Sequence, residues 1–394
     1  MRNKLYGLKN DSLLPARIHF HTLDALRFFA FLAVFLFHVP VQGVFSVFSF
    51  LKQNGSTGVI FFFVLSGFLI TYILVTEKIK EGQIRIQKFF VRRSFRIWPL
   101  YFLVVAIAYA VPFSTAQKIG MHIVGDGYIP DWRFSFTFTE NYKMLLTDSF
   151  PMTSPLQVFW SLCVEEHFYI IWMFALLMIP LRGLRYFFAG TIVIAIISRT
   201  FEINLIANWT ISDSDVLTNM DLFGLGGMLG YAAASYYEKT SNIINRIPVW
   251  TKCLFIVLTF GAIILHENIF PWKYPGSKIF SQTFYGLMLT CCIAIFIPQN
   301  SKLKISNRNI LSRLGQISYG LYVWHILAIH IVFQYFIDHH IVIDDITTLS
   351  VFILITFTAT VLMSIVSYRF FEKPFLVLRE KNKGRNSVNQ LPAA

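Results

Sequence analysis

The sequence predicts an all-α protein, a polytopic transmembrane helix bundle of about ten spans. Of its 394 residues 55% are hydrophobic and only 14% are charged, whereas soluble domains carry roughly 25% charged residues. Ten apolar runs approach the roughly 20 residues that a spanning helix needs. They lie near residues 22–41, 56–76, 98–113, 156–179, 186–200, 216–235, 252–266, 279–298, 316–336 and 347–370.

Basic residues predict the orientation of this bundle. With cytoplasmic N- and C-termini, about 26 of the 34 Lys and Arg residues fall in cytoplasmic loops, as the positive-inside rule requires. The same rule accounts for the net charge of +13, so we expect contact with membrane lipid and no nucleic acid. We predict a cytoplasmic segment over 1–21, a transmembrane domain over 22–375 and a polar, disordered tail over 376–394.

Two segments between the apolar runs are not predicted to span the membrane. Residues 77–97 mix basic and apolar side chains, which predicts an amphipathic cytoplasmic linker, with Pro99 in the first turn of the next helix. Residues 130–150 are rich in aromatic side chains but also contain Arg133, Glu140 and Lys143, which predicts a non-spanning, partly buried segment. The first run is too long for the core of a signal peptide, so we expect it to be retained.

The first apolar run carries three polar side chains at positions where hydrocarbon makes them costly. Arg27 and His38 share one helical face about 16 Å apart, and Asp24 lies about 40° from the His38 direction. The topology puts Asp24 and Arg27 toward the cytoplasm and His38 in the outer half. A neutral buried histidine can act as a general base. The alternatives are an interfacial Asp24–Arg27 ion pair and a histidine bonded to a neighbouring helix.

Three arginines precede the third apolar run. Arg92 and Arg93 lie four and three residues before Arg96, so Arg96 shares a helical face with both. Guanidinium groups bind phosphates bidentately, which makes the cluster a candidate phosphate site. A basic cluster that stops membrane insertion would have the same spacing.

Two further stretches place polar groups within spans. In "FWSLCVEEHFYIIW", Glu165 and Glu166 favour an arginine partner or a polar cavity, or else an interfacial position beside Trp and Tyr. In "ISYGLYVWHILAIH", Ser318, Tyr322 and His325 form one helical stripe. Hydrogen bonds between helices are the alternative explanation of that stripe.

The remaining motifs favour packing over chemistry. The four cysteines lie in or beside apolar runs and include no C-x-x-C pair, so we predict no metal site. Glycines in "GSTGVIFFFVLSGF" and small residues around Asp221 in "TNMDLFGLGGMLG" indicate close helix packing. No phosphate-loop, G-x-S-x-G or H-E-x-x-H pattern is present.

Six stretches together resemble the acyltransferase 3 family of bacterial integral-membrane acyltransferases. They cover about residues 22–375 and read, in order, "LDALRFFAFLAVFLFH", "GVIFFFVLSGFLIT", "FFVRRSFRIWPLY", "FWSLCVEEHFY", "ISYGLYVWH" and "FEKPF". The resemblance implies an O-acyltransferase of the bacterial inner membrane that uses an acyl donor, usually acetyl-CoA, from the cytoplasm. It implies no permanently bound cofactor. The usual acceptor is a saccharide hydroxyl of a lipopolysaccharide, an exopolysaccharide, a related glycan or its lipid-linked precursor.

The resemblance also implies site residues. Those that match family motifs are Arg27, His38, Arg93, Arg96, Glu165, Tyr319, Tyr322 and His325. The arginines are expected to hold the donor phosphates. Tyr319, Tyr322 and His325 are expected to line a cavity for the pantetheine arm. His38 is expected to deprotonate the acceptor or to carry the acyl group, while Asp24 or Glu165 orients it or balances charge.

One departure from the family pattern stands out. Many members carry Arg two residues before the position of Asp221, where this chain has Asn219. We expect no SGNH domain beyond the bundle.

A transporter or flippase is a rival function, since it too places charges in the membrane, but the chain shows no internal repeat. An acyltransferase for a macrolide or lipid hydroxyl is the other alternative. The sequence does not distinguish direct transfer from an acyl-histidine relay. It also does not determine the chain length of the acyl group or the oligomeric state.

Overall fold

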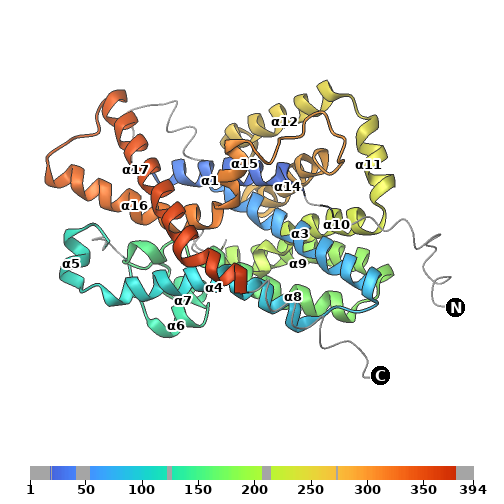
Figure 1. Cartoon of the computed structure of the whole chain (residues 1–394), viewed down its shortest axis with the longest axis horizontal. Coiled ribbons are helices and arrows are strands. Elements are labelled where there is room, and N and C mark those ends of the chain that lie inside the picture. The colour runs from blue at the N-terminus through green and yellow to red at the C-terminus, as the bar shows by residue number, and fades with distance from the viewer. Residues whose placement is uncertain are drawn as a thin grey trace.

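The computed structural model describes residues 18, 20–40, 54–121, 127–205, 214–271 and 274–378, and every named element within these ranges is a helix (Figure 1). The all-α class is therefore confirmed. Most of the predicted cytoplasmic segment 1–21 and of the tail 376–394 lies outside the described residues.

Each of the ten predicted apolar runs falls on a helix. These helices are α1 (Thr22–His38), α3 (Thr57–Glu81), α4 (Ile86–Ala110), α8 (Trp160–Met178), α9 (Leu184–Leu205), α10 (Met220–Ser235), α12 (Val249–Ile264), α14 (Pro275–Ile295), α16 (Ser318–Asp338) and α17 (Ile346–Ser367). The shorter elements are α5 (Phe113–Lys118), α6 (Trp132–Phe136), α7 (Glu140–Thr147), α11 (Tyr237–Arg246), α13 (His266–Ile269), α15 (Ile310–Gln316), three 3₁₀ turns (Ser154–Leu156, Leu181–Gly183 and Leu217–Asn219) and a π-helical turn (Tyr368–Glu372).

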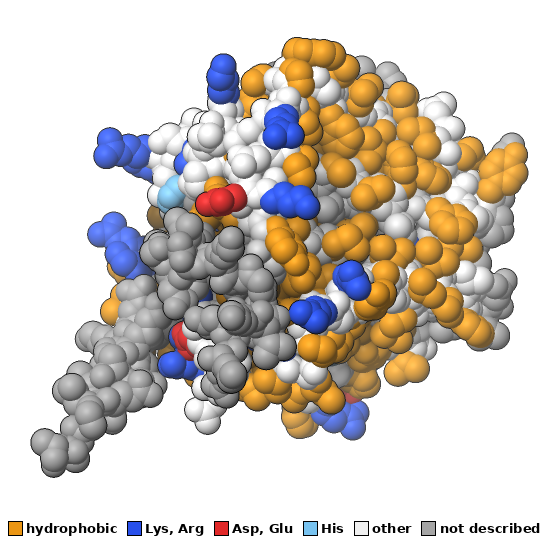
Figure 2. Space-filling model, turned by 90° about the vertical axis from the view of Figure 1, so that its right-hand side faces the viewer, with side chains coloured by type: hydrophobic (Ala, Val, Ile, Leu, Met, Phe, Trp, Pro, Cys, Tyr) orange, Lys and Arg blue, Asp and Glu red, His pale blue; other side chains and the backbone are white. Residues whose placement is uncertain are grey.

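The length and apolarity of the helices identify a polytopic membrane protein. Within the described residues, five helices are long and apolar enough to cross a membrane, and a sixth is counted if α11 and α12, which meet at 91°, form one span. Figure 2 shows a face covered largely by hydrophobic side chains, with Lys and Arg gathered along one border. Soluble monomers rarely expose so continuous an apolar surface. The full count of ten spans stays a prediction.

The prediction of a separate linker over 77–97 is wrong, because these residues belong mostly to two helices. Helix α3 continues to Glu81, where Gly82 ends it with a φ of 73°, and α4 already begins at Ile86. Pro99 therefore lies inside α4 rather than in its first turn, where it cannot donate a hydrogen bond to the preceding turn. The apolar run marked only the second half of α4, because arginines are good helix formers and extend the helix beyond it.

Residues 130–150 form α6 and α7, both too short to cross a membrane, in agreement with the predicted non-spanning segment. Glu140 at the start of α7 is fully buried. Its carboxylate accepts hydrogen bonds from the Ser135 hydroxyl at 2.5 Å and from the Tyr128 hydroxyl. Burial nevertheless raises the pKa of the Glu140 carboxyl. The two hydrogen bonds connect α7 to Ser135 of α6 and to Tyr128 in the loop before α6.

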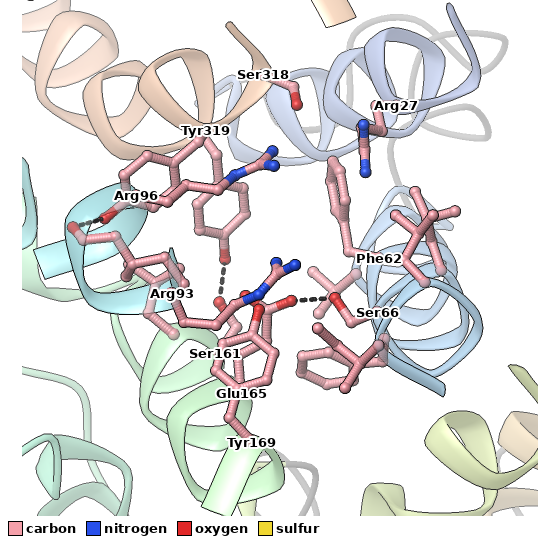
Figure 3. A pocket seen from close by; sticks show the side chains of 18 residues that line it. Arg27, Phe62, Ser66, Arg93, Arg96, Ser161, Glu165, Tyr169, Ser318 and Tyr319 are labelled. Atoms are coloured by element: carbon pink, nitrogen blue, oxygen red, sulfur yellow. Dashed lines mark hydrogen bonds between the residues drawn. The ribbon is translucent and has the colours of Figure 1, made fainter. Parts of the chain in front are cut away.

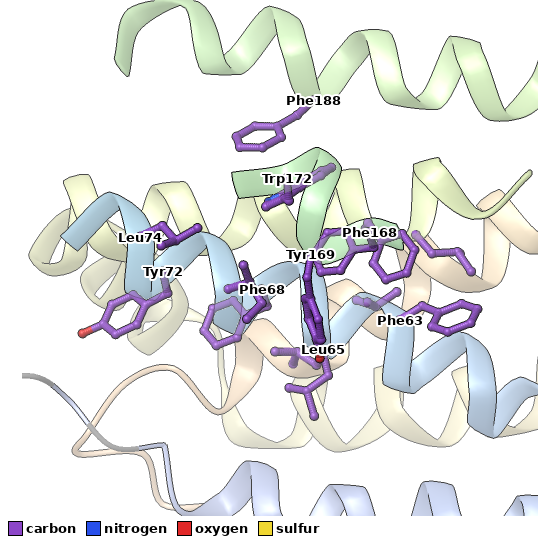
Figure 4. Close-up of a cluster of buried hydrophobic side chains, with 14 of the residues drawn as sticks. Phe63, Leu65, Phe68, Tyr72, Leu74, Phe168, Tyr169, Trp172 and Phe188 are labelled. Atoms are coloured by element: carbon purple, nitrogen blue, oxygen red, sulfur yellow. The ribbon is translucent and has the colours of Figure 1, made fainter. Parts of the chain in front are cut away.

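Helix α3 lies at the centre of the bundle, where it packs on α1, α8, α10 and α14. Aromatic side chains fill the space between these helices (Figure 4). The Phe168 ring stacks on Phe223 with their centroids 3.9 Å apart, and the Trp172 indole donates a hydrogen bond to the Thr71 hydroxyl at 2.7 Å. This packing holds α8 against α3 and α10 and so positions Glu165, which lies one turn before Phe168 on α8.

Glycines bring α3 and α10 into backbone contact. A Cβ atom at Gly226 would overlap the carbonyl oxygen of Val64, and one at Gly67 would overlap that of Phe223. Close approach of this kind stabilises helix pairs in lipid by van der Waals packing.

We predict that Gly226→Ala lowers the melting temperature of the protein in detergent. The added methyl group meets backbone, which can move only if the helices separate, and overpacking costs about 1–3 kcal/mol. Gly190→Ala in α9 is the matched control, because no atom lies within 4 Å of its added Cβ. Equal melting temperatures for the two variants would contradict the close crossing.

Candidate active site

A cavity of about 100 Å³ lies between α1, α3, α4, α8 and α16 (Figure 3). Its polar lining comprises Arg27, Ser66, Arg93, Arg96, Ser161, Glu165, Tyr169, Ser318, Tyr319 and Tyr322. Of the residues predicted for the site, Asp24, His38 and His325 do not line it. The folding of five helices thus brings together three arginines and one carboxylate from separate parts of the chain.

The three arginines point into the same space (Figure 3). The Arg27 guanidinium forms an ion pair with Asp24 at 2.5 Å, one turn away on α1, so the predicted Asp24–Arg27 pair is present. The Arg93 guanidinium lies 5.7 Å from the centroid of the Tyr169 ring. Among the described residues no hydrogen bond or ion pair holds Arg93 or Arg96, and the Nε atom of Arg93 is buried. Buried cations in this arrangement favour an anionic ligand.

The arginine cluster of the sequence divides into two roles. Arg92 turns away from the cavity and forms an ion pair with Glu77 of α3 at 3.2 Å. Both side chains are largely buried, so this pair ties the start of α4 to the end of α3. Arg93 and Arg96 face the cavity instead, because positions three residues apart share a helical face.

The two neighbouring glutamates of α8 also separate. Glu165 faces the cavity and accepts a hydrogen bond from the Ser66 hydroxyl of α3. Glu166 accepts from the indole of Trp98 at 3.3 Å and does not line the cavity. Consecutive helical residues point about 100° apart, which explains the division. Ser66 was not predicted; its only signal is that it is a lone hydroxyl in an otherwise apolar stretch of α3.

Two histidines lie next to the end of the cavity. The Tyr322 ring lines the cavity, and its hydroxyl bonds the Ser161 hydroxyl at 2.6 Å. The backbone carbonyl of Tyr322 accepts a hydrogen bond from His325 at 2.5 Å. His325 in turn lies 3.2 Å from His38. Two members of the predicted stripe on α16 therefore form hydrogen bonds to neighbouring helices, Tyr322 to α8 and His325 to α1. Through them the cavity is connected to His38.

A buried ion pair outside the cavity accounts for the departure at Asn219. Asp221 and Arg199 are both almost completely buried, and their charged groups lie 2.5 Å apart. Arg199 also donates to the backbone carbonyls of Thr218 at 2.9 Å and Ile279 at 2.6 Å. The arginine partner of Asp221 thus comes from α9. This contact was not predicted, because Arg199 lies at the end of an apolar run and carries no pattern that points to Asp221.

We predict that Arg199→Leu alone destabilises the protein strongly, by about 3–5 kcal/mol, because it leaves Asp221 charged, buried and without its cation. The double variant Arg199→Leu with Asp221→Leu should recover most of the loss, since no charge then stays buried. Thermal unfolding in detergent measures both. A double variant no more stable than Arg199→Leu would show that the pair is not the cause.

Comparison with known proteins identifies the family. Residues 20–369 match the family profile described as an acyltransferase domain. The chain belongs to the acyltransferase 3 family. The match includes every helix that contributes to the cavity and all of the predicted site residues.

Relatives of this family member carry acetyltransferase names. The chain is 28% identical over 380 residues to the peptidoglycan O-acetyltransferase OatA of Listeria monocytogenes, with 91% of this chain and 56% of OatA covered. It is 28% identical over 318 residues to YrhL of Bacillus subtilis, which is assigned as a peptidoglycan O-acetyltransferase, with 77% and 47% covered. The chain therefore spans about half the length of the curated relatives it matches. No solved structure matches it.

Proposed function

We propose that this protein is an O-acyltransferase of the bacterial inner membrane that transfers an acetyl group from cytoplasmic acetyl-CoA to a hydroxyl of a cell-surface saccharide or its lipid-linked precursor. The observation that carries this proposal is a cavity beside a histidine pair, lined by two arginines that form no ion pair with any described residue. Membership of the acyltransferase 3 family favours acyl transfer over transport. The name of OatA, a peptidoglycan enzyme, supports a saccharide acceptor.

Arg93 and Arg96 are proposed to bind the donor phosphates. Each guanidinium can make two parallel hydrogen bonds to phosphate oxygens, and neither forms a hydrogen bond or ion pair with another described residue. Arg27, held by Asp24, adds positive charge at the same space. A volume of about 100 Å³ accepts a phosphate or the thioester end but not a whole nucleotide. We therefore expect the adenosine part to stay at the mouth of the cavity.

His38 is proposed to act as the general base. It takes the proton of the acceptor hydroxyl, the alkoxide oxygen attacks the thioester carbonyl, and the tetrahedral intermediate expels the CoA thiolate as the ester forms. An acyl-histidine relay would use the same imidazole as the nucleophile. Glu165 balances the charge of Arg93 and Arg96 before the donor binds. Tyr319 and Tyr322 line the route between the two ends.

The predicted topology matches this chemistry. With cytoplasmic termini and ten spans, Arg93 and Arg96 follow a cytoplasmic connection between α3 and α4, and His38 ends α1 in the outer half of the membrane. A donor from the cytoplasm and an acceptor in the outer half would then meet inside the bundle.

The experiment that tests the function is acceptor-dependent release of CoA by the purified protein in lipid nanodiscs. Acetyl-CoA is supplied with peptidoglycan fragments, a lipid-linked saccharide, a macrolide or a phospholipid in separate reactions. We expect release with a saccharide and an acetyl ester on that saccharide by mass spectrometry. Release only with the macrolide or phospholipid would replace the acceptor class, and no release with any acceptor would contradict acyl transfer.

A further inference from the structure

The hydrogen bonds of His325 determine which of its nitrogens carries the proton. His325 lies on α16 and is completely buried. Its Nδ1 atom lies 2.5 Å from the backbone carbonyl oxygen of Tyr322. A carbonyl oxygen can only accept a hydrogen bond, so Nδ1 must donate. In a neutral imidazole the other nitrogen then carries the lone pair, which makes Nε2 of His325 an acceptor.

The same reasoning applies to His38. The Nε2 acceptor of His325 lies 3.2 Å from Nδ1 of His38, so Nδ1 of His38 is the donor. That nitrogen also lies 2.9 Å from the carbonyl oxygen of Val34 one turn earlier on α1. Two acceptors from different helices therefore both favour a proton on Nδ1. The lone pair of His38 is left on Nε2.

We infer that His325 is a positioning residue that holds His38 in the Nδ1–H tautomer, so that Nε2 is the basic atom that meets the acceptor hydroxyl. This inference rests on the proposed role of His38 as the base. In catalytic triads a carboxylate orients the base by accepting its Nδ1–H; here a neutral imidazole does so. Phe31 packs edge-on against His325 with the centroids 6.0 Å apart and keeps the imidazole ring oriented.

The chain of contacts also connects this tautomer to the donor cavity. Tyr322 offers its carbonyl to His325 and its ring to the cavity, and the Phe62 ring lies 6.2 Å from it. The Tyr322 hydroxyl is fixed by Ser161. A single residue of α16 therefore fixes both the end of the donor cavity and the orientation of the histidine pair.

Two variants of His325 separate positioning from structure. His325→Gln can donate from its amide nitrogen to Tyr322 and accept at its amide oxygen from His38, whereas His325→Leu can do neither. We expect His325→Leu to lose about 100-fold in kcat with donor KM unchanged, a loss at the low end of what general-base catalysis contributes. His325→Gln should stay within about tenfold of wild type. Equal losses in the two variants would overturn the inference.

Solid-state ¹⁵N NMR of histidine-labelled protein measures the tautomer itself, and His38→Asn assigns the His38 signals. We expect a protonated Nδ1 and an unprotonated Nε2 on His38 in the wild type. In His325→Leu the carbonyl of Val34 still favours Nδ1–H, so we expect a smaller but not zero fraction of this tautomer. A protonated Nε2 on wild-type His38 would overturn the inference. If His325→Leu does not fold, the wild-type spectrum still decides. Because the spectrum does not depend on turnover, failure of the proposed function is distinguished from failure of this inference.

Discussion

Replacing His38 by alanine abolishes acyl transfer in this account and leaves donor binding unchanged. The imidazole is the only group proposed to take the proton of the acceptor, and general-base catalysis contributes about 10²–10⁴-fold to a rate. The donor phosphates are proposed to bind at Arg93 and Arg96, which lie on another helix, α4. We therefore expect CoA release to fall at least 100-fold while the Kd for acetyl-CoA stays within about twofold.

A second histidine variant is the control for His38→Ala. His340 is exposed in the connection after α16 and has a φ of 53°, a conformation that asparagine tolerates. His340→Asn should transfer acyl groups at the wild-type rate. Normal acylation by His38→Ala would remove His38 from the mechanism, and a loss of acetyl-CoA binding in that variant would show that it acts on the donor.

Removing either cavity arginine should weaken donor binding. A hydrogen bond to a charged group contributes about 1.5–3 kcal/mol, so Arg93→Gln and Arg96→Gln should each raise the Kd for acetyl-CoA about 10- to 100-fold. Isothermal titration calorimetry measures this directly. Arg92→Gln is the matched control, because Arg92 is adjacent in sequence but pairs with Glu77.

The same arginine variants identify the part of the donor that they contact. S-acetylpantetheine has the thioester arm of acetyl-CoA but no phosphates. It should bind wild type, Arg93→Gln and Arg96→Gln with equal affinity. A tenfold weaker affinity of the variants for S-acetylpantetheine would mean that the arginines act on the cavity rather than on phosphates. Weakening of acetyl-CoA binding by Arg92→Gln to the same degree would exclude a specific site at Arg93 and Arg96.

The apolar runs predicted the fold, and the errors of that prediction have a physical cause. Every apolar run became a helix because lipid-facing helices must satisfy their backbone groups internally. The prediction failed at residues 77–97, since hydrophobicity marks where a helix meets lipid and not where it ends. Arg92 is an example, because it lies in α4 and forms an ion pair with Glu77 although no apolar run includes it.

The site was predictable residue by residue but not as an arrangement. The sequence indicated Arg27 and Glu165 from their cost in the membrane and Arg93 from the spacing of the arginine cluster, and all three line one cavity. Which helices face each other cannot be found from periodicity, so the contact between His38 and His325, on helices nearly three hundred residues apart, was not expected. The Arg199–Asp221 pair is a similar long-range contact.

Asp24 illustrates how the structure refines a predicted role. The sequence offered it as a catalytic group or as a partner of Arg27, and the structure shows the ion pair, with Asp24 outside the cavity lining. We therefore propose that Asp24 acts through Arg27, whose guanidinium it holds at the cavity. Asp24→Asn should then affect donor affinity more than the rate of transfer at saturating donor.

Transfer of an isotope label tests most directly whether His38 is needed to transfer the acetyl group of a donor bound at Arg93 and Arg96. Membrane vesicles with wild type or His38→Ala receive acetyl-CoA labelled in the acetyl group together with the saccharide acceptor, and the label in the acceptor is counted. We expect labelled saccharide with wild type and none with His38→Ala, although both proteins bind labelled donor. Equal labelling of the saccharide by the two proteins would contradict this expectation.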